Sequence, residues 1–375
     1  MPKKILFYSE SWGIGGIENL VMDLARNLDK DDYAMDIFST WDSNDAYDEE
    51  LRFLGTRRFT VFKGYRPDLL KRQIMGTKRF GQLLRQEHYD IVHINTMNGM
   101  GFTYSQAAKK QGIKTRIVHS HNSSFGEGHV FIKTLGHNFG KTFLGSSATI
   151  RLACSDAAGQ YLFGKHPYTI IQNGIDTDKF AFSPESRIRI RKELKIDDGT
   201  LILGSLARIA QQKNPLFSLD VFAEIHQKIQ NSVFVMIGSG DMEKEVKDKI
   251  SSLNLNESVI RIPRTTSPQE YYSAFDILIS PSFFEGFGLT TIEAQSAGLP
   301  VICSTAYPSE IILTDLVKRI SLDAPLSEWV KEIIVYAQAG HDSTVNRTSY
   351  KAIIESKGYS SRNMVRQIEQ IYQGA

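Results

Sequence analysis

The stretch SPSFFEGFGLTTIEAQSAGLPVICS, residues Ser280 to Ser304, contains a glycine-bracketed aromatic between a short apolar run and a helix-like segment. The apolar run, Ile277 to Ile279, is long enough only for a short buried strand. Neither Gly nor Pro interrupts Leu289 to Ala297, and Gly298 with Pro300 then forms a helix stop signal. The segment is therefore predicted to run from a strand through a glycine-rich turn and a helix into a second strand.

Two carboxylates, Glu285 and Glu293, flank this turn. Such a turn points backbone N–H groups and the positive end of the helix dipole at one spot, which favours an anion. A carboxylate would repel that anion. We therefore expect the two side chains to hold other parts of the same ligand.

Strand-like runs alternate with helical patterns along the chain, which predicts an α/β fold with parallel sheets built from βαβ units. The alternation stops once, at NGIDTDKFAFSP between Gln172 and Glu185, and we expect the domain boundary there. Each half then forms a doubly wound sheet that binds ligands beyond the carboxyl ends of its strands. Two such sheets facing each other would form a cleft.

Composition excludes several classes of protein. The 375 residues include 44 Lys and Arg against 42 Asp and Glu, so the formal charge of +2 gives no case for nucleic acid binding. Cys154 and Cys303 lie in apolar contexts without metal-ligand spacing, which favours reduced core cysteines and a cytosolic protein. The N-terminal apolar run is too short for a signal peptide, and no stretch reaches the ~20 apolar residues of a spanning helix. We expect a soluble protein, or one that lies on a membrane surface.

Glycines follow the first predicted strand in SESWGIGGIENL, where Gly13, Gly15 and Gly16 precede a helix. They would let the backbone approach a ligand closely, although glycines in such a turn can also serve packing alone. The pattern is not the GxGxxG fingerprint, and Asp42 and Asp45 come too late to bind a ribose at the second strand. These features argue against a nicotinamide enzyme.

Arg208 and Lys213 lie in the loop of LGSLARIAQQKNP, between the first strand of the second half and its helix. Two cations beside a helix N-terminus would suit a diphosphate. The alternative is a solvated basic loop.

Histidines end a strand in RIVHSHNSSFGEGH, where His119, His121 and Asn122 follow one another closely. The spacing puts both imidazoles on one face, but no third metal ligand is near. We expect a substrate contact at the strand end, with a structural histidine as the alternative. Asp176 and Asp178 have metal-ligand spacing, yet we interpret them as turn residues after Asn-Gly.

A basic stripe occurs in DLLKRQIMGTKRFGQLLRQ. A helix would gather its five cations on one side and four apolar residues roughly opposite, although Gly76 and Gly81 caution against one unbroken rod. The stripe is either a dock for anionic lipid or an ordinary solvated face. The cations are Lys71, Arg72, Lys78, Arg79 and Arg85, and the apolar residues are Leu70, Ile74, Phe80 and Leu84.

Four motifs together resemble a known family. Glu285 and Glu293, separated by seven residues within FFEGFGLTTIEAQSAGLPVI, resemble the Glu-x7-Glu signature of family 4 retaining glycosyltransferases with the GT-B fold. GGIENLVMDLARNL, QNGIDTDKF and ARIAQQKNP are similar to other landmarks of that family, in its order, so the resemblance extends from Lys4 to Tyr372. RIVHSHNSSF is similar to enzymes of bacterial exopolysaccharide and capsule synthesis. Ala207 departs from the glycine that the family often has there.

The resemblance assigns roles to particular residues. It implies that Glu293 binds the ribose hydroxyls of a nucleotide-sugar, that Glu285 binds hydroxyls of the transferred hexose, and that His121 contacts this hexose near its reacting carbon. The diphosphate would lie between Arg208, Lys213 and the backbone of Gly286, Phe287, Gly288 and Leu289. Gly15 and Gly16 would approach the diphosphate or the acceptor, and His119, Asn122 and Asn173 would line the acceptor side. Catalysis would rest on His121, Glu285, Arg208 and Lys213.

The resemblance also implies an activity. A hexose or N-acetylhexosamine would pass from a UDP-sugar to a glycan or lipid-linked acceptor, with retention of configuration and without a metal or other cofactor. Residues 1–178, joined by part of 358–375 through the last helix, would bind the acceptor, and residues 179–357 the donor. The enzyme would work in the cytoplasm, either free or at the inner face of the membrane. A catalytically silent binding partner, or a GT-B epimerase or phosphorylase, is the alternative.

Overall fold

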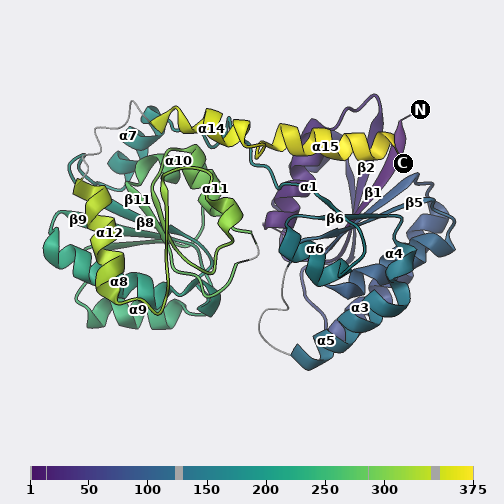
Figure 1. The fold of residues 1–375 in the computed structure, drawn as a ribbon, viewed down its shortest axis with the longest axis horizontal. Coiled ribbons are helices and arrows are strands. Elements are labelled where there is room, and N and C mark those ends of the chain that lie inside the picture. Colours follow the sequence, from purple (N-terminus) through teal and green to yellow (C-terminus); the bar gives the residue numbers. More distant parts are fainter. Residues whose placement is uncertain (1, 14, 123–129, 286, 339–346, 375) are drawn as a thin grey trace. The chain divides into compact units, whose positions relative to one another are not determined.

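The computed structural model describes residues 2–13, 15–122, 130–285, 287–338 and 347–374. The chain forms two compact units, one of Met1–Gly174 with Ser361–Ala375 and one of Ile175–Ser360 (Figure 1). These divisions lie a few residues from those expected at 178/179 and 357/358. The turn-rich segment after Gln172 carries no sharp local signal that would fix the boundary to one residue.

The first unit is built on a parallel sheet with the strand order β3-β2-β1-β4-β5-β6-β7. The strand β1 lies between β2 and β4 and is buried on both faces, with Ile5 and Phe7 on one side and Leu6 and Tyr8 on the other. The strands are β1 (Lys3–Trp12), β2 (Tyr33–Asp42), β3 (Arg57–Phe62), β4 (Ile91–Thr96), β5 (Thr115–Ser120), β6 (Ile150–Ala153) and β7 (Thr169–Ile170). The helices are α1 (Gly16–Asn27), α2 (Asp48–Leu54), α3 (Leu69–Gln86), α4 (Phe102–Lys110), α5 (Val130–Phe139), α6 (Asp156–Phe163) and α15 (Ser361–Gln373).

The C-terminal helix α15 belongs to the first unit and packs against α1, yellow beside purple in Figure 1. Met364, Ile368 and Tyr372 recur on one face and are fully buried in the same core as β1. The Lys3 ammonium also donates a hydrogen bond of 2.7 Å to the Tyr372 carbonyl. The expected return of the last helix to the first domain is confirmed.

The second unit has a parallel sheet with the order β10-β9-β8-β11-β12-β13. The order reverses direction between β8 and β11, and ligands of such sheets bind beyond the carboxyl ends of the strands at this point. The strands are β8 (Leu201–Leu206), β9 (Ser232–Ile237), β10 (Val259–Ile262), β11 (Ile277–Ser280), β12 (Val301–Ser304) and β13 (Val317–Ile320). The helices are α7 (Pro184–Glu193), α8 (Pro215–Lys228), α9 (Glu243–Ser252), α10 (Pro268–Ala274), α11 (Leu289–Ser296), α12 (Leu326–Gln338) and α14 (Tyr350–Ser356).

The helix α3 is continuous over 18 residues in spite of its two glycines. Asp68 caps its N-terminus by accepting a hydrogen bond of 2.9 Å from the Lys71 backbone N–H. A side chain at Gly76 would collide with the Tyr104 hydroxyl and Thr40, so this glycine allows close packing against the sheet. Tertiary packing thus offsets the helix-breaking tendency of glycine.

The basic stripe on α3 differs from its expected form. Arg72 is buried and paired with the Glu10 carboxylate, so it does not share the exposed face of Lys71 and Lys78. Leu70 and Ile74, expected roughly opposite the cations, are 69% and 60% exposed. At about 100° per residue, positions 70, 71, 74 and 78 fall within one arc of the helix, whereas position 72 turns inward. Apolar and cationic side chains therefore share one exposed face.

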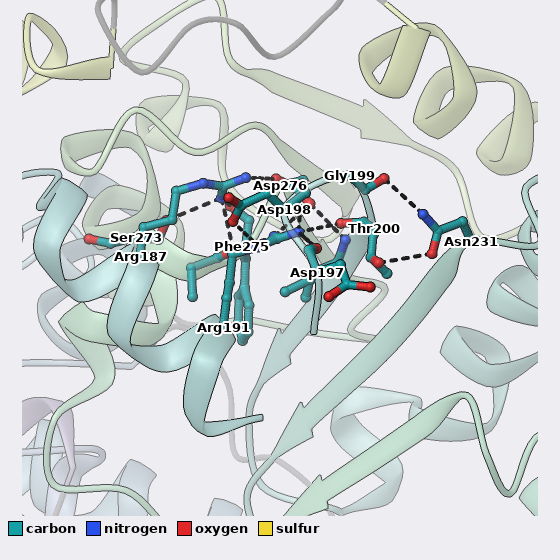
Figure 2. A network of polar contacts seen from close by, with 12 residues as sticks. Arg187, Arg191, Asp197, Asp198, Gly199, Thr200, Asn231, Ser273, Phe275 and Asp276 are labelled. Atoms are coloured by element: carbon teal, nitrogen blue, oxygen red, sulfur yellow. Dashed lines mark hydrogen bonds and ion pairs between the residues drawn. The ribbon is translucent and has the colours of Figure 1, made fainter. Parts of the chain in front are cut away.

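A buried carboxylate ties together the amino ends of β8 and β11 (Figure 2). Asp276, just before β11, accepts a 2.7 Å hydrogen bond from the Ile202 backbone N–H of β8. It also pairs with Arg187 at 2.7 Å and Arg191 at 3.4 Å, both on α7. Arg191 is 1% exposed and donates further to the Thr200 carbonyl at 2.6 Å. The network fixes α7 and both strands at the end of the sheet opposite to the switch-point crevice.

We predict that Asp276→Asn destabilises the second unit by about 3–5 kcal/mol, because it leaves two guanidinium groups without their buried counter-charge. Urea unfolding, followed by hydrogen exchange of amides in β8 and β11, measures the change. Asp198→Asn is the matched control, because that carboxylate lies 3.9 Å from Arg191 but is 95% exposed. Equal stability of the two variants would contradict the prediction.

Candidate functional site

The loops after β8 and β11 meet because these two strands pair side by side. Gln212 joins the loops, since its carbonyl accepts from the Phe283 N–H at 2.9 Å and its amide donates to the Phe284 carbonyl at 3.0 Å. This residue was not identified from the sequence, where a lone glutamine in a loop carries no signal. Its two hydrogen bonds bring Arg208 and Lys213 next to the segment that holds Glu285.

Lys213 and Glu285 form an ion pair with a distance of 2.5 Å between Nζ and Oε1. Their side chains are 19% and 8% exposed, so the pair is largely shielded from water. Both residues were expected at the site, the lysine on a phosphate and the carboxylate on a sugar, and the structure brings them into direct contact. Arg208 is exposed and donates to the Gln212 side chain at 3.2 Å.

The turn before α11 requires glycine at position 288. Gly288 has φ of +95°, and a Cβ there would lie 2.5 Å from the Tyr307 ring. Phe287 is buried and stacks on Tyr359 at 6.0 Å, so its side chain anchors the turn in the core. Leu289 begins α11, whose positive dipole end faces the carboxyl side of the sheet. Gly286 lies outside the described residues.

Glu293 lies on α11 and is 8% exposed. Its Oε2 accepts a 2.9 Å hydrogen bond from the Tyr272 hydroxyl of α10. Burial raises the pKa of Tyr272 well above its usual value, so the phenol remains a donor. Tyr272 orients the carboxylate, and sequence reasoning missed it because the two positions are brought together only by packing of α10 on α11.

The carboxylate of Glu18 lies close to Gly15 at the N-terminus of α1. Gly15 is its N-cap in extended backbone and Gly16 its first residue, as expected for the turn after β1. Glu18 folds back over this turn, because a Cβ on Gly15 would lie 2.6 Å from its Oε2. Ser11 donates to the same carboxyl at 3.2 Å, and burial raises the pKa of Glu18. This site therefore suits ligand hydroxyls better than phosphate.

His119 is fully buried within β5 and does not present an accessible surface. Its Nδ1 is 3.2 Å from Nε2 of His93, and its ring centroid is 4.1 Å from that of His121. The expectation that His119 lines the acceptor side is therefore corrected. Because β5 pairs with β4 and the His119 side chain points into the core, its ring packs against the buried side of the His121 ring.

His121 follows the end of β5 and is partly exposed. Its Nε2 is 2.9 Å from Oδ1 of Asn95, whose amide nitrogen donates to the Tyr8 carbonyl at 3.3 Å. That second bond fixes the amide orientation, so Nε2 of His121 carries the proton and Nδ1 is an acceptor. The protein groups packed around the imidazole keep most water from it, and this desolvation lowers the pKa of His121 to about 3, so the ring is neutral at physiological pH.

The remaining expected residues are Asn122, Asn173, Asp176 and Asp178. Asn122 is partly exposed beside His121, while Asn173 is buried and its Oδ1 has no hydrogen-bond partner among the described residues. Asp176 accepts from the Lys179 N–H at 3.0 Å, as in a turn, and Asp178 pairs with Lys351. Within the described ranges, no three His, Cys, Asp or Glu side chains converge as metal ligands would.

Comparison with known proteins identifies the family. The family described as "Glycosyl transferases group 1" matches residues 186–354, and "Glycosyltransferase Family 4" matches residues 14–179. The putative glycosyltransferase EpsF of Bacillus subtilis is 28% identical over 99% of this chain and 96% of its own length. An Escherichia coli enzyme named UDP-Gal:alpha-D-GlcNAc-diphosphoundecaprenol alpha-1,3-galactosyltransferase is 28% identical over 60% of this chain and 59% of its own length.

Solved structures share the fold. Anabaena HepE in complex with UDP-glucose superposes with a TM-score of 0.80 at 19% identity, covering 99% of this chain and all of that one. Of the helices in the described part of the chain, none is both long and apolar enough to cross a membrane. Two Rossmann-like parallel-sheet units and two family matches that together extend over residues 14–179 and 186–354 lead to one conclusion: this chain belongs to the family 4 type of GT-B glycosyltransferases.

Proposed function

We propose that this enzyme transfers a hexose or N-acetylhexosamine from a UDP-sugar to a glycan or lipid-linked acceptor, with retention of configuration. The Escherichia coli relative, by its name, uses UDP-galactose and a diphosphoundecaprenol-linked sugar, and HepE was solved with UDP-glucose. The lipid-linked substrate in the name of that Escherichia coli relative, together with the resemblance of RIVHSHNSSF, supports a role in exopolysaccharide, capsule or another envelope glycan.

The observation that carries the proposal is the pair of anchored carboxylates on either side of the Gly288 turn. Glu293, oriented by Tyr272, accepts hydrogen bonds from the vicinal ribose hydroxyls. Glu285, oriented by Lys213, accepts from hexose hydroxyls. The diphosphate lies between them, at the N-terminus of α11.

Stabilisation of the negative charge on the leaving nucleotide lowers the energy barrier of the reaction. Negative charge grows on the diphosphate as its bond to the sugar breaks, and Arg208 and Lys213 are cations beside that position. Lys213 is already fixed by Glu285, so it needs little reorganisation during the reaction. His121, neutral with Nδ1 as an acceptor, contacts the hexose. Arg208 and Lys213 supply positive charge to the diphosphate, and we propose that no divalent metal is needed.

The activity is tested by incubating the protein with UDP-sugars and lipid-linked or oligosaccharide acceptors, with and without EDTA. We expect a glycosylated acceptor with the anomeric configuration of the donor, formed equally with chelator. Conversion of the donor without an acceptor would indicate an epimerase, and phosphate-dependent cleavage a phosphorylase. Donor binding without turnover would indicate a silent binding partner, and loss with EDTA that Mn²⁺ restores would disprove metal independence.

We predict that Glu293→Gln weakens UDP-sugar binding by about 10-fold to 150-fold, the range for hydrogen bonds to a charged group. Tyr272→Phe should weaken it less, since the carboxylate remains but loses one orienting donor. Isothermal titration calorimetry with UDP measures both effects. Glu257→Gln, on the exposed surface of the same unit, is the control. Unchanged affinity in Glu293→Gln would disprove the ribose assignment.

We further propose that the exposed face of α3 docks on anionic lipid at the cytoplasmic side of the membrane. Leu70, Ile74 and Met75 are exposed beside Lys71 and Lys78, which suits insertion of apolar side chains between anionic headgroups. Each cation near such a surface contributes roughly 1 kcal/mol.

The two cysteines support a cytoplasmic location for the enzyme. Cys154 and Cys303 are buried and form no disulfide, as is usual for proteins in a reducing compartment.

Vesicle co-sedimentation tests this dock. We expect the wild type to bind vesicles with phosphatidylglycerol but not pure phosphatidylcholine, and to be released by high salt. A Lys71, Lys78 and Arg85 to Glu variant should lose binding, and a Leu70 and Ile74 to Ser variant should weaken it without changing the salt dependence. The matched control is Lys244, Lys247 and Lys249 to Glu on α9 of the other unit. Equal binding of all variants, or none by the wild type, would eliminate α3 as the dock.

A further inference from the structure

A chain of buried polar side chains links the C-terminal helix to His121. Tyr372 of α15 lies with its hydroxyl 2.7 Å from Nδ1 of His93 on β4. Nε2 of His93 is 3.2 Å from Nδ1 of His119 on the neighbouring strand β5. The ring of His119 lies against that of His121, with centroids 4.1 Å apart. All three groups behind His121 are completely buried.

The donors and acceptors of the three side chains determine which atom donates the proton in each hydrogen bond of this chain. If Tyr372 donates to His93, then His93 Nε2–H donates to His119, and only the Nε2–H of His119 is left without a partner among the described residues. The reverse direction would also leave the Tyr372 hydroxyl proton without an acceptor in the described part of the chain. Burial lowers the pKa of both histidines and raises that of Tyr372, so all three are neutral. The tautomers of His93 and His119 therefore follow from the tyrosine.

Fold stability alone does not explain these residues. A buried donor without a partner is unfavourable, and apolar side chains of similar shape would fill the same core without that cost. His93 already stacks on Phe7 at 4.8 Å, in surroundings that suit an aromatic hydrocarbon ring. The chain of polar side chains ends at the imidazole of His121, which in the proposed function contacts the transferred hexose.

We propose that Tyr372 is a positioning residue for His121 that acts through His93 and His119. The packing position of the C-terminal helix α15 then sets the orientation of the imidazole that contacts the hexose. Asn95 holds the edge of the His121 ring and His119 holds its face. Removing the Tyr372 hydroxyl frees His93 and His119 to change tautomer, and the support behind His121 is lost. This inference rests on the proposed function for its effect on transfer, but not for its effect on the histidines.

Kinetics of Tyr372→Phe test the effect on transfer. We expect kcat to fall about threefold to tenfold, the range carried by a neutral hydrogen bond, with unchanged KM for the UDP-sugar. His119→Phe should give a similar loss, and the double variant should be no worse than either single one, because both break one chain. Tyr33→Phe is the control, since its ring lies 5.7 Å from that of Tyr372 in the same core. Additive losses, or a Tyr372→Phe kcat equal to that of Tyr33→Phe, would overturn the inference.

Imidazole 15N NMR of histidine-labelled protein provides a readout that does not depend on transfer. The nine histidines can be assigned by single substitutions. We expect wild-type His93 and His121 as Nε2–H tautomers, and altered His93, His119 and His121 signals in Tyr372→Phe but not in Tyr33→Phe. Unchanged signals would overturn the inference. If the wild type transfers no sugar, the proposed function fails, while these spectra still decide whether Tyr372 controls the histidines.

Discussion

The buried Asp276 carboxylate is the constraint on which the second unit depends. A charge in the interior must be matched, and this one is matched by two arginines of α7 and by a backbone N–H of β8. The contacts join one helix and two strands that are distant in sequence. Because β8 and β11 are short and pair side by side, fixing their amino ends also fixes where Arg208, Lys213 and Glu285 follow their carboxyl ends.

The first unit also buries polar groups that are neutral. Tyr372, His93 and His119 carry no charge in its core and need only hydrogen-bond partners. A neutral chain is cheaper to bury than an ion pair, and it can transmit orientation through its tautomers. The C-terminal helix thereby becomes part of the framework behind His121, although it is the last element of the chain.

Two carboxylates beside the Gly288 turn are anchored in different ways. Lys213 matches the charge of Glu285, whereas Tyr272 offers Glu293 a neutral donor from the core. A charge-matched carboxylate can lie near a phosphate with little repulsion. A carboxylate held by a phenol keeps its full charge for ligand hydroxyls. The two environments fit the different roles proposed for them.

The sequence by itself determined the α/β class, the two-sheet organisation and the glycine turn before α11, whereas the return of the last helix was expected only from the family resemblance. The first three features follow from local rules, because periodicity reflects which faces are buried and Gly288 reflects a backbone angle that other residues avoid. Tertiary structure alone decided which side chains meet. It paired Lys213 with Glu285, placed Tyr272 on Glu293, buried Arg72 and His119, and exposed Leu70 and Ile74. Such contacts depend on strand register and helix packing between distant segments, which no local pattern encodes.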